Sequence, residues 1–251
     1  MSESASPVAW QCAEVVSAFL DRRQALIPLL DVQEDLIRVL IDRHAHPIER
    51  FLDIGCGDGA MSELVLSRRP DSEAVLVDFS EPMLERAGRR LEGRAGRWRA
   101  VRSDLSDPGW HAQLAPAGFG AAVSALAIHH LPPERKRSLF AEIFELLEPG
   151  GMFVNLDYVC VEGPLHGLFD EQMVANAVRA ERERGGDRSA EQVRHDLLDD
   201  DGDEDLPDSA EQQVKWLSEA GFRGAEVHFK WAEASVFGAV KPTGGAVDAG
   251  D

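Results

Sequence analysis

A short string of alternating glycines follows an apolar run and limits the folds that this chain can adopt. The run Phe51–Ile54 leads directly into Gly55, Gly57 and Gly59, and a segment with helical spacing follows over about residues 59–69. Glycines at such a turn let the backbone approach a ligand, and the helix N-terminus presents unpaired N–H groups. This arrangement binds nucleotide-like ligands at the carboxyl edge of a parallel sheet. A tight turn without a ligand is the alternative for this string taken alone.

Short apolar runs alternate with helical segments as far as residue 157. The predicted strands are Arg50–Ile54, Ala74–Asp78, Trp98–Arg102, Gly120–Leu126 and Met152–Asp157, and the predicted helices cover residues 59–69, 81–92 and 133–147. The string Glu148-Pro149-Gly150-Gly151 is expected to end the last of these helices. Such alternation is typical of a parallel sheet with helical crossovers.

Helical segments flank this alternating region. Residues 9–45 carry apolar residues at helical spacing, which predicts two or three helices with Pro28 interrupting one of them. Residues 164–205 are polar and charged, and they end in six acids among the seven residues 199–205. We expect that acidic run to form a solvated mobile loop. The alternative, a calcium site, lacks the glutamate that an EF-hand loop carries at its twelfth position.

A helix and a pair of strands are expected near the end of the sequence. The helix covers residues 209–219, with Asp208 or Ser209 as its N-cap and Gly221 as its stop. Residues 222–229 and 231–240 both alternate, so they predict an antiparallel hairpin joined near Lys230.

The amino-acid composition limits the kinds of molecule that the protein is expected to bind. The net charge of −19 removes the general attraction to phosphate backbones and to anionic membrane surfaces. The basic string Arg135, Lys136 and Arg137 is expected on a solvated helix face. Three scattered cysteines predict neither a disulfide framework nor a zinc site. With no signal sequence and no apolar run long enough for a membrane span, we expect a cytoplasmic protein.

A dinucleotide-binding fold is an alternative interpretation of the glycine string. Residues 55–60 also match the pattern G-x-G-x-x-A, and Asp78 lies where that fold carries a ribose-binding acid. Three features argue against it. Asp53 would repel a pyrophosphate but suits a cationic amino group. About 45 residues of helical pattern precede the first strand. Asp104 follows the third strand, where a carboxylate can accept a hydrogen bond from an adenine amino group.

Five motifs in order resemble those of class I S-adenosylmethionine (SAM)-dependent methyltransferases. They are Phe51–Gly59, Val77–Ser80 with Pro82–Leu84, Ser103–Leu105, Ser124–Leu131 and Leu147–Gly151. The resemblance covers residues 50–157, and the closing hairpin extends it to about residue 240. It implies an α/β fold with a Rossmann-like, doubly wound, seven-stranded sheet of order 3-2-1-4-5-7-6 and an antiparallel strand 7. N-terminal helices and a helical insert after strand 5 would complete that fold.

The resemblance also implies which residues hold SAM, with S-adenosylhomocysteine as the product. Asp53 and the glycines are expected at the methionine half, Asp78 at the ribose, Phe79 at the adenine, residues 104–105 at its far edge, and residues 125–126 beneath the cofactor. The expected cofactor-binding set is Asp53, Gly55, Cys56, Gly57, Gly59, Asp78, Phe79, Met83, Asp104, Leu105, Ala125 and Leu126. No metal site is expected.

The expected division of the chain has five parts. They are an N-terminal helical lid (1–45), a SAM-binding core (46–160), a helical cap (161–208), a last helix and hairpin that complete the core (209–242), and a disordered tail (243–251).

Two C-terminal stretches resemble a bacterial subgroup that includes carboxy-SAM synthase. They are residues 213–222 and 230–242, and residues 19–28 correspond to the lid of that subgroup. Leu29 stands where an aromatic residue often follows the proline of that lid. This difference argues against carrying over a substrate from the subgroup.

Candidate catalytic residues follow strands four and five. Methyl transfer mainly needs alignment and a dry site, and a general base is needed only where the nucleophile must lose a proton. His129, His130 and Tyr158 lie at the edge where the methyl group should point, and histidine titrates near neutral pH. The alternatives are a helix cap or a backbone hydrogen bond for a histidine, and a rim contact for Tyr158.

The leading hypothesis is therefore methyl transfer from SAM to a small-molecule acceptor, without direct nucleic-acid or membrane partners and with a homodimer as one possible assembly. The alternatives are a SAM-modifying enzyme like carboxy-SAM synthase and a SAM-binding protein without catalysis. The flanking helical segments are expected to determine the substrate. Within them, Arg22, Arg23, Arg179 and Arg182 are candidates for an anionic substrate, or they pair with neighbouring acids.

Overall fold

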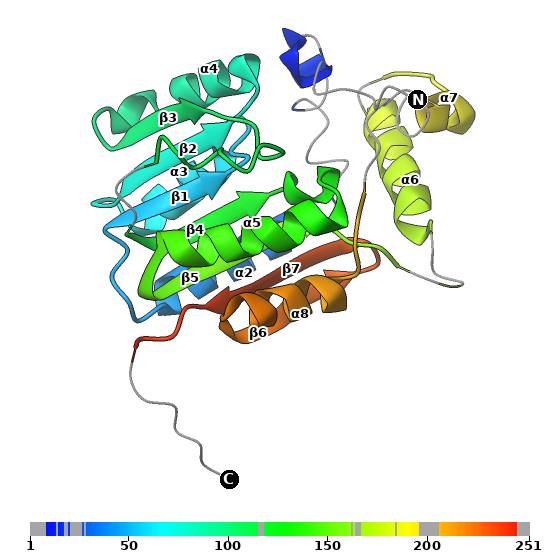
Figure 1. Ribbon diagram of the computed structural model, residues 1–251. Coiled ribbons are helices and arrows are strands. Elements are labelled where there is room, and N and C mark those ends of the chain that lie inside the picture. The colour runs from blue at the N-terminus through cyan, green and yellow to red at the C-terminus, as the bar shows by residue number, and fades with distance from the viewer. Residues whose placement is uncertain are drawn as a thin grey trace.

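One mixed sheet of seven strands organises the chain (Figure 1). The computed structural model describes residues 9–13, 15–17, 20, 27, 29–114, 118–161, 163, 167–183, 185–195 and 206–244. The strands are β1 (Arg50–Ile54), β2 (Glu73–Asp78), β3 (Trp98–Arg102), β4 (Phe119–Ala125), β5 (Leu147–Tyr158), β6 (Arg223–Trp231) and β7 (Ala234–Val240). Their order is β3-β2-β1-β4-β5-β7-β6, and β7 runs antiparallel to both of its neighbours. The fold implied by the sequence motifs is thereby confirmed.

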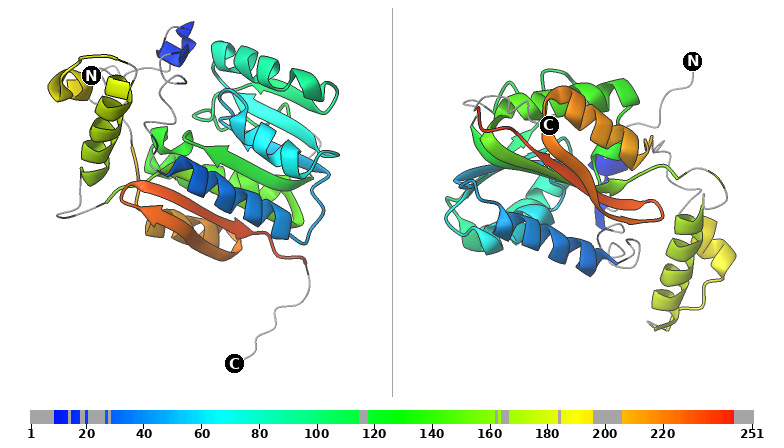
Figure 2. Two further views of the ribbon diagram at one scale, coloured as in Figure 1. Left: turned by 180° about the vertical axis from the view of Figure 1, so that it is seen from behind. Right: turned by 90° about the horizontal axis from the view of Figure 1, so that it is seen from below.

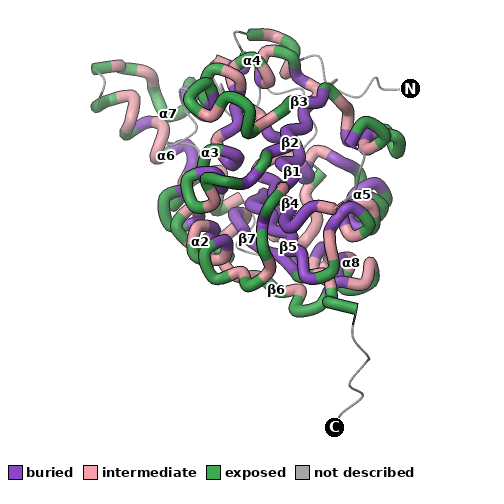
Figure 3. The backbone as a smooth tube through the Cα atoms, turned by 90° about the vertical axis from the view of Figure 1, so that its left-hand side faces the viewer, coloured by how far each residue is buried: buried purple, intermediate pink, exposed green. Residues whose placement is uncertain are grey.

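The central strands are apolar because both faces of the sheet are covered. Side chains of successive strand residues point to opposite faces. Leu52 and Ile54 accordingly belong to one buried cluster, whereas Phe51 belongs to a second cluster on the other face. Figure 3 shows the sheet as a buried band between helices whose outer surfaces are exposed.

Helices cover each face of the sheet. Helices α2 (Leu30–Arg43), α3 (Ala60–Arg68) and α4 (Glu81–Arg90) lie on one face, and α5 (Pro133–Leu146) and α8 (Ala210–Ala220) lie on the other (Figure 2). The 3₁₀ turns are η1 (Ala9–Gln11), η2 (Glu92–Arg94) and η3 (Ile128–His130). This layering brings the carboxyl ends of β1 to β5 to a common edge, which we call the carboxyl edge.

Two helices after β5 form a cap that stands to one side of the sheet (Figures 1 and 2). They are α6 (Leu168–Glu183) and α7 (Ala190–Arg194). Met173 of α6 packs near Tyr158 and Ala234, while Val178 and Val193 belong to a small cluster between the two helices. The helical insert implied after strand 5 is therefore present.

The closing segments differ in detail from the expected boundaries. Ser209 caps α8 by accepting from the N–H of Gln212, and Gly221 ends that helix at a φ of 109°. The hairpin turns at residues 232–233 rather than near Lys230, and Ala232 there has a φ of 48°. Pro28 and the acidic run at 199–205 lie outside the described residues.

Candidate functional site

The glycine loop joins β1 to α3 at the carboxyl edge, and its three glycines have different structural tasks. All three have positive φ, at 63° for Gly55, 51° for Gly57 and 78° for Gly59. A Cβ on Gly55 would lie 2.2 Å from the Cβ of Ala127, and one on Gly59 would lie 3.1 Å from that of Ala87. A Cβ on Gly57 would meet only the sulfur of Met83, at 3.8 Å. Gly55 and Gly59 therefore allow close packing, whereas Gly57 leaves room beside the backbone.

Asp78 ends β2 and ties the glycine loop to the turn before α4. Its Oδ2 accepts from the N–H of Gly57 at 2.8 Å, and its Oδ1 accepts from the N–H of Ser80 at 2.8 Å. Burial raises the pKa of Asp78, and the surrounding backbone N–H groups oppose that shift. Each carboxylate oxygen keeps acceptor capacity for a further donor, such as a ribose hydroxyl.

Asp53 is a fully buried acid with one oxygen left without a partner. Ser62 of α3 donates to Oδ2 at 2.5 Å, whereas Oδ1 has no hydrogen-bond partner among the described residues. Burial raises the pKa of Asp53 to about 7. An uncompensated buried carboxylate oxygen calls for an explanation, because such groups are almost always paired. A cationic amino group placed against Oδ1 would supply the missing partner.

Cys56 and Met83 border the loop as buried side chains. Burial raises the pKa of the Cys56 thiol well above its usual value, which keeps it neutral. The backbone N–H of Met83 donates to the side chain of Ser80, which caps α4. Both residues are therefore placed to shape the loop by packing.

The far side of the expected cofactor site is formed after β2 and β3. Phe79 is half-buried, and Leu105 is buried. Asp104 is half-buried and accepts from the N–H of Ser106 at 2.8 Å. The carbonyl of Leu105 accepts from Nε of Arg135 at 2.7 Å, so a side chain of α5 holds this segment in place.

The expectation that Arg135 and Lys136 lie on a solvated helix face was wrong. Arg135 is 8% exposed and forms a bidentate pair with Glu142, at 2.9 and 2.7 Å. Lys136 is fully buried and pairs with Asp208 at 2.8 Å. Arg137 alone is exposed, and it pairs with Glu219. A basic string cannot reveal these burials, because they depend on distant segments: Arg135 donates to the carbonyl of Leu105 after β3, and Lys136 donates to residues 206 and 208.

The end of β4 passes the glycine loop and then turns sharply. Ala125 and Leu126 are half-buried, and Leu126 has a φ of 54°, which is unusual for a side chain of its size. Its N–H donates to the carbonyl of Leu156 at 2.9 Å. Such local strain is typical of functional sites and is held here by the two flanking strands.

The candidate catalytic residues come together just beyond this turn. Nδ1 of His129 lies 2.5 Å from Oδ1 of Asp157, and both side chains are buried. The ring centroid of His129 lies 3.9 Å from that of His130 and 5.1 Å from that of Tyr158. All three candidates are therefore neighbours, and Asp157 joins them.

Sequence reasoning missed a contribution from the N-terminal turn η1. The carbonyl of Trp10 accepts from Oγ of Ser80 at 2.5 Å, and Nε2 of Gln11 donates to the carbonyl of Phe79 at 3.0 Å. The Trp10 ring lies 6.4 Å from that of His130. The turn thus connects the end of β2 with the loop after β4. No local pattern reveals this contact, because it joins residues about 70 positions apart.

Of the four arginines suggested for an anionic substrate, the structure describes Arg179 and Arg182, and both lie on α6. Arg179 donates to Asn176 on its own helix. Arg182 lies in the last turn of α6. Arg22 and Arg23 lie outside the described residues. In the described parts of the chain, no group of histidines, cysteines and acids is arranged to hold a metal ion, and no helix is long and apolar enough to cross a membrane.

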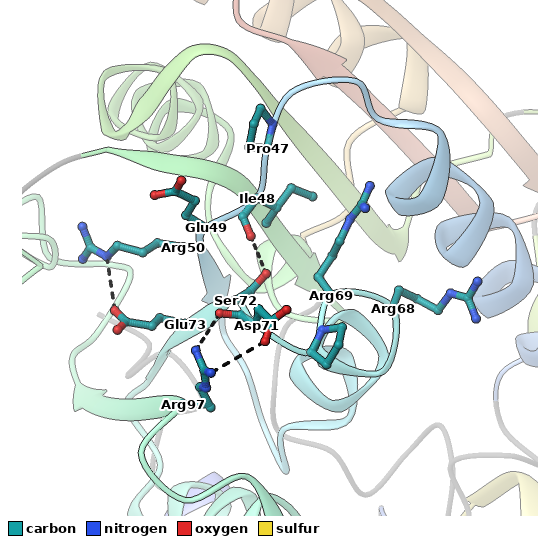
Figure 4. Close-up of a pocket in the computed structure, with 11 residues that line it drawn as sticks. Pro47, Ile48, Glu49, Arg50, Arg68, Arg69, Asp71, Ser72, Glu73 and Arg97 are labelled. Atoms are coloured by element: carbon teal, nitrogen blue, oxygen red, sulfur yellow. Dashed lines mark hydrogen bonds and ion pairs between the residues drawn. The ribbon is translucent and has the colours of Figure 1, made fainter.

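A pocket of about 620 Å³ lies at the opposite, amino edge of the sheet (Figure 4). Its lining includes four arginines, but Arg97 pairs with Asp71 and Arg50 lies 4.0 Å from Glu73. The pocket is far from the glycine loop, because residues 47–49 and 70–72 precede β1 and β2, and Arg50 and Glu73 are the first residues of these strands. Its position separates it from the carboxyl-edge site.

The middle part of the chain is similar to known methyltransferases. Residues 51–151 match the family described as methyltransferase domain. Trans-aconitate 2-methyltransferase of Acidovorax sp. (strain JS42) is 31% identical over 60% of this chain and 55% of its own length. Carboxy-S-adenosyl-L-methionine synthase of Aeromonas hydrophila is 28% identical over 56% of each chain. The chain thus spans about half the length of these curated relatives.

Among solved structures, human N-acetylserotonin methyltransferase in complex with SAM has a similar fold. The TM-score is 0.61 at 16% identity, over 97% of this chain and 60% of the human chain. This likeness concerns the fold alone. The matched residues 51–151 contain the glycine loop and β1 to β4, and the sheet order agrees with the motifs. Residues 51–151 are therefore similar to a methyltransferase domain, and they lie within the sheet order that the sequence motifs implied.

Proposed function

We propose that the protein transfers the methyl group of SAM to a small-molecule acceptor. The unpaired Oδ1 of Asp53 carries this proposal, because it lies on the strand that runs into the glycine loop and requires a cationic partner. The methionine amino group of SAM has that charge. Gly57, in the loop that follows this strand, leaves space beside its backbone, and its N–H donates to the carboxylate of Asp78.

The remaining expected residues fit the other parts of the cofactor. Asp78 would receive the ribose hydroxyls, Phe79 would border the adenine, and residues 104–105 would frame its far edge. The backbone at residues 125–126 would pass beneath the methionine half. The roles of all twelve cofactor-binding residues are part of this proposal.

The chain would align the acceptor with SAM and exclude water from the site, while SAM supplies an activated methyl group. Burial of Asp53 and the contact of Trp10 with the end of β2 both reduce water at the edge. Reacting groups held in a fixed geometry gain most of the acceleration that such a transfer needs. His129, His130 and Tyr158 lie where an acceptor would meet the methyl group.

A carboxy-SAM synthase is the second candidate. The synthase of Helicobacter hepaticus is 23% identical over 87% of this chain and 89% of its own length. That activity needs a cation for the extra carboxylate. Four described cations near the carboxyl edge are already paired with acids, namely Arg90, Arg102, Arg135 and Lys136. This pairing favours methyl transfer, and a SAM-binding protein without catalysis stays as a third candidate.

We further propose a cytoplasmic protein that acts on small molecules without nucleic acid, as a monomer or a homodimer. The net charge of −19 supports the absence of a nucleic-acid partner.

Calorimetric titration of the purified protein with SAM, and separately with NAD, tests the proposal. We expect micromolar SAM binding that Asp78→Ala abolishes, and no NAD binding. Mass spectrometry of the co-purifying ligand separates the candidates, because a carboxylated SAM would favour the synthase. NAD binding, or failure to bind SAM, would contradict the proposal.

A further inference from the structure

Asp157, at the end of β5, has a carboxylate that is fully buried and surrounded by donors. Its Oδ2 accepts from the N–H of His129 at 3.0 Å and from Nδ2 of Asn155 at 3.2 Å. Its Oδ1 accepts from the N–H of Tyr158 at 3.0 Å and lies 2.5 Å from Nδ1 of His129. The three donors of fixed direction, two backbone N–H groups and the Asn155 amide, suit an ionised carboxylate, which only accepts hydrogen bonds.

This carboxylate determines which nitrogen of His129 carries a proton. The nitrogen that faces an acceptor must be the donor, so Nδ1 is protonated and Nε2 is the basic nitrogen of the neutral ring. The same carboxylate also holds the backbone N–H of His129, so main chain and ring are fixed together. A buried acid that fixes tautomer and orientation is the arrangement that makes a histidine an effective base.

We propose that Asp157 is a positioning residue that prepares His129 as the general base, and that the acceptor is therefore a hydroxyl or an amine. The inference rests on the proposed function. The attacking atom of such an acceptor must lose a proton, and a base is useful only then. A carboxylate or thioether acceptor has no proton to lose.

The transfer step is balanced with these groups alone. A lone pair of the acceptor oxygen or nitrogen forms the bond to the methyl carbon, while the carbon–sulfur bond breaks and leaves its electron pair on sulfur. The acceptor proton passes to Nε2 of His129. Asp157 then faces an imidazolium, and the positive charge that leaves the sulfonium is stabilised by that carboxylate.

Several described groups surround this pair. His130 and Tyr158 flank the His129 ring, at centroid distances of 3.9 and 5.1 Å. On the side of the 206–208 segment, the N–H of Leu206 donates to the His129 carbonyl at 3.0 Å. Among the described residues, the titratable groups that face the base include Asp157, His130 and Tyr158, and the buried pair of Lys136 and Asp208 lies beyond the Leu206 contact.

A second histidine–carboxylate pair provides a matched control. Nε2 of His46 lies 2.8 Å from Oε2 of Glu148, but these side chains are 26% and 44% exposed. That pair lies at the amino end of β5, away from the glycine loop. Solvent competes for both groups there, so loss of the acid should have little influence on the histidine.

Nitrogen NMR of the full chain with ¹⁵N-labelled histidine tests the pair without any acceptor. We expect Nδ1 of His129 to carry the proton, and we expect Asp157→Asn to move the proton to Nε2, because an amide can donate to Nδ1. His129→Gln assigns the signals, and Glu148→Gln should leave them unchanged. A wild-type proton on Nε2, or a tautomer unaffected by Asp157→Asn, would overturn the proposal.

Transfer from trideuteromethyl-SAM to a catechol, an aryl amine, a thioether and a dicarboxylate tests the acceptor class. We expect methylation of the catechol or the amine, with kcat lowered about 10²–10⁴-fold by His129→Gln and by Asp157→Asn, and KM changed little. Imidazole should partly restore His129→Ala. Methylation of the dicarboxylate or the thioether alone would overturn the proposal.

The two proposals fail in different ways. Loss of SAM binding in the calorimetric titration would end the proposed function while leaving the tautomer of His129 as described. SAM binding with the wrong tautomer would end only the inference about Asp157. If none of the four probes is methylated, the tautomer measurement alone decides.

Discussion

At the scale of single residues, Asp53, which we propose to bind SAM, is expected to destabilise the unliganded protein as pH rises. A buried acid whose pKa is raised from 3.8 to about 7 holds a proton in the folded chain that the unfolded chain releases. Protons bound only in the folded state make stability fall as pH rises between those two values. The loss of stability is greatest above about pH 7, where Asp53 carries the negative charge that SAM binding would need.

We predict that Asp53→Asn removes this pH dependence. Between pH 5 and pH 8 the unliganded wild type should lose about 2–3 kcal/mol of unfolding free energy that the variant keeps. Urea unfolding at both pH values measures the difference. Asp71→Asn, at an exposed acid, is the control and should behave like the wild type. Calorimetry should show weaker SAM binding in Asp53→Asn. Equal pH dependence in both variants would contradict the prediction.

Gly55 is the residue of the loop least able to accept a side chain. We predict that Gly55→Ala costs about 2–4 kcal/mol, because the new Cβ meets that of Ala127 and φ is positive. Chemical unfolding measures the loss. Gly93→Ala adds a Cβ where nothing lies within 4 Å, so it should change stability little. A similar loss in both variants would show that close packing is not the cause.

At the scale of elements, the buried pair of Lys136 and Asp208 joins α5 to the segment that precedes α8. Lys136 also donates to the carbonyl of Leu206, whose N–H holds the His129 carbonyl. One buried side chain therefore connects a helix, the entry to α8 and the candidate base.

Removing one partner of a buried pair leaves a charge without compensation. We predict that Lys136→Met lowers the free energy of unfolding by about 3–5 kcal/mol, and that Arg137→Met, which breaks an exposed pair, changes it by less than about 1 kcal/mol. Thermal and urea unfolding of the two variants give the comparison. Equal effects would mean that the Lys136 pair contributes no more than a surface contact.

Local patterns were sufficient for the elements and insufficient for the contacts between them. The glycine loop and the central strands followed from apolar runs and turns, which depend on neighbours along the chain, whereas the strand order was implied by the resemblance alone. The contact between Trp10 and Ser80 and the pair of His129 and Asp157 join distant segments, so no spacing rule reveals them. The expectation that Lys136 lies on a solvated helix face was wrong for the same reason. The expected division into lid, core, cap and tail stays a prediction.

At the scale of the whole molecule, the net charge of −19 is the dominant property. Many like charges repel one another in the compact state, and salt screens that repulsion. We predict that the unfolding midpoint rises when ionic strength is raised from low to physiological with sodium chloride. Potassium chloride should give the same rise, which would separate screening from specific ion binding. A falling midpoint would show that attractive ion pairs outweigh the repulsion.

The cap has a small apolar cluster of its own, formed by Val174, Val178 and Val193, apart from the two clusters of the sheet. Substitutions that reshape it need not disturb the packing beneath the glycine loop. On the proposed function, the cap would meet the acceptor, so it could diversify during evolution while the proposed SAM site is retained. The family match at residues 51–151 ends before this cap begins, as expected if descent preserves one half more strictly than the other. We therefore expect that exchanging the cap between relatives changes the acceptor while the proposed SAM site is kept.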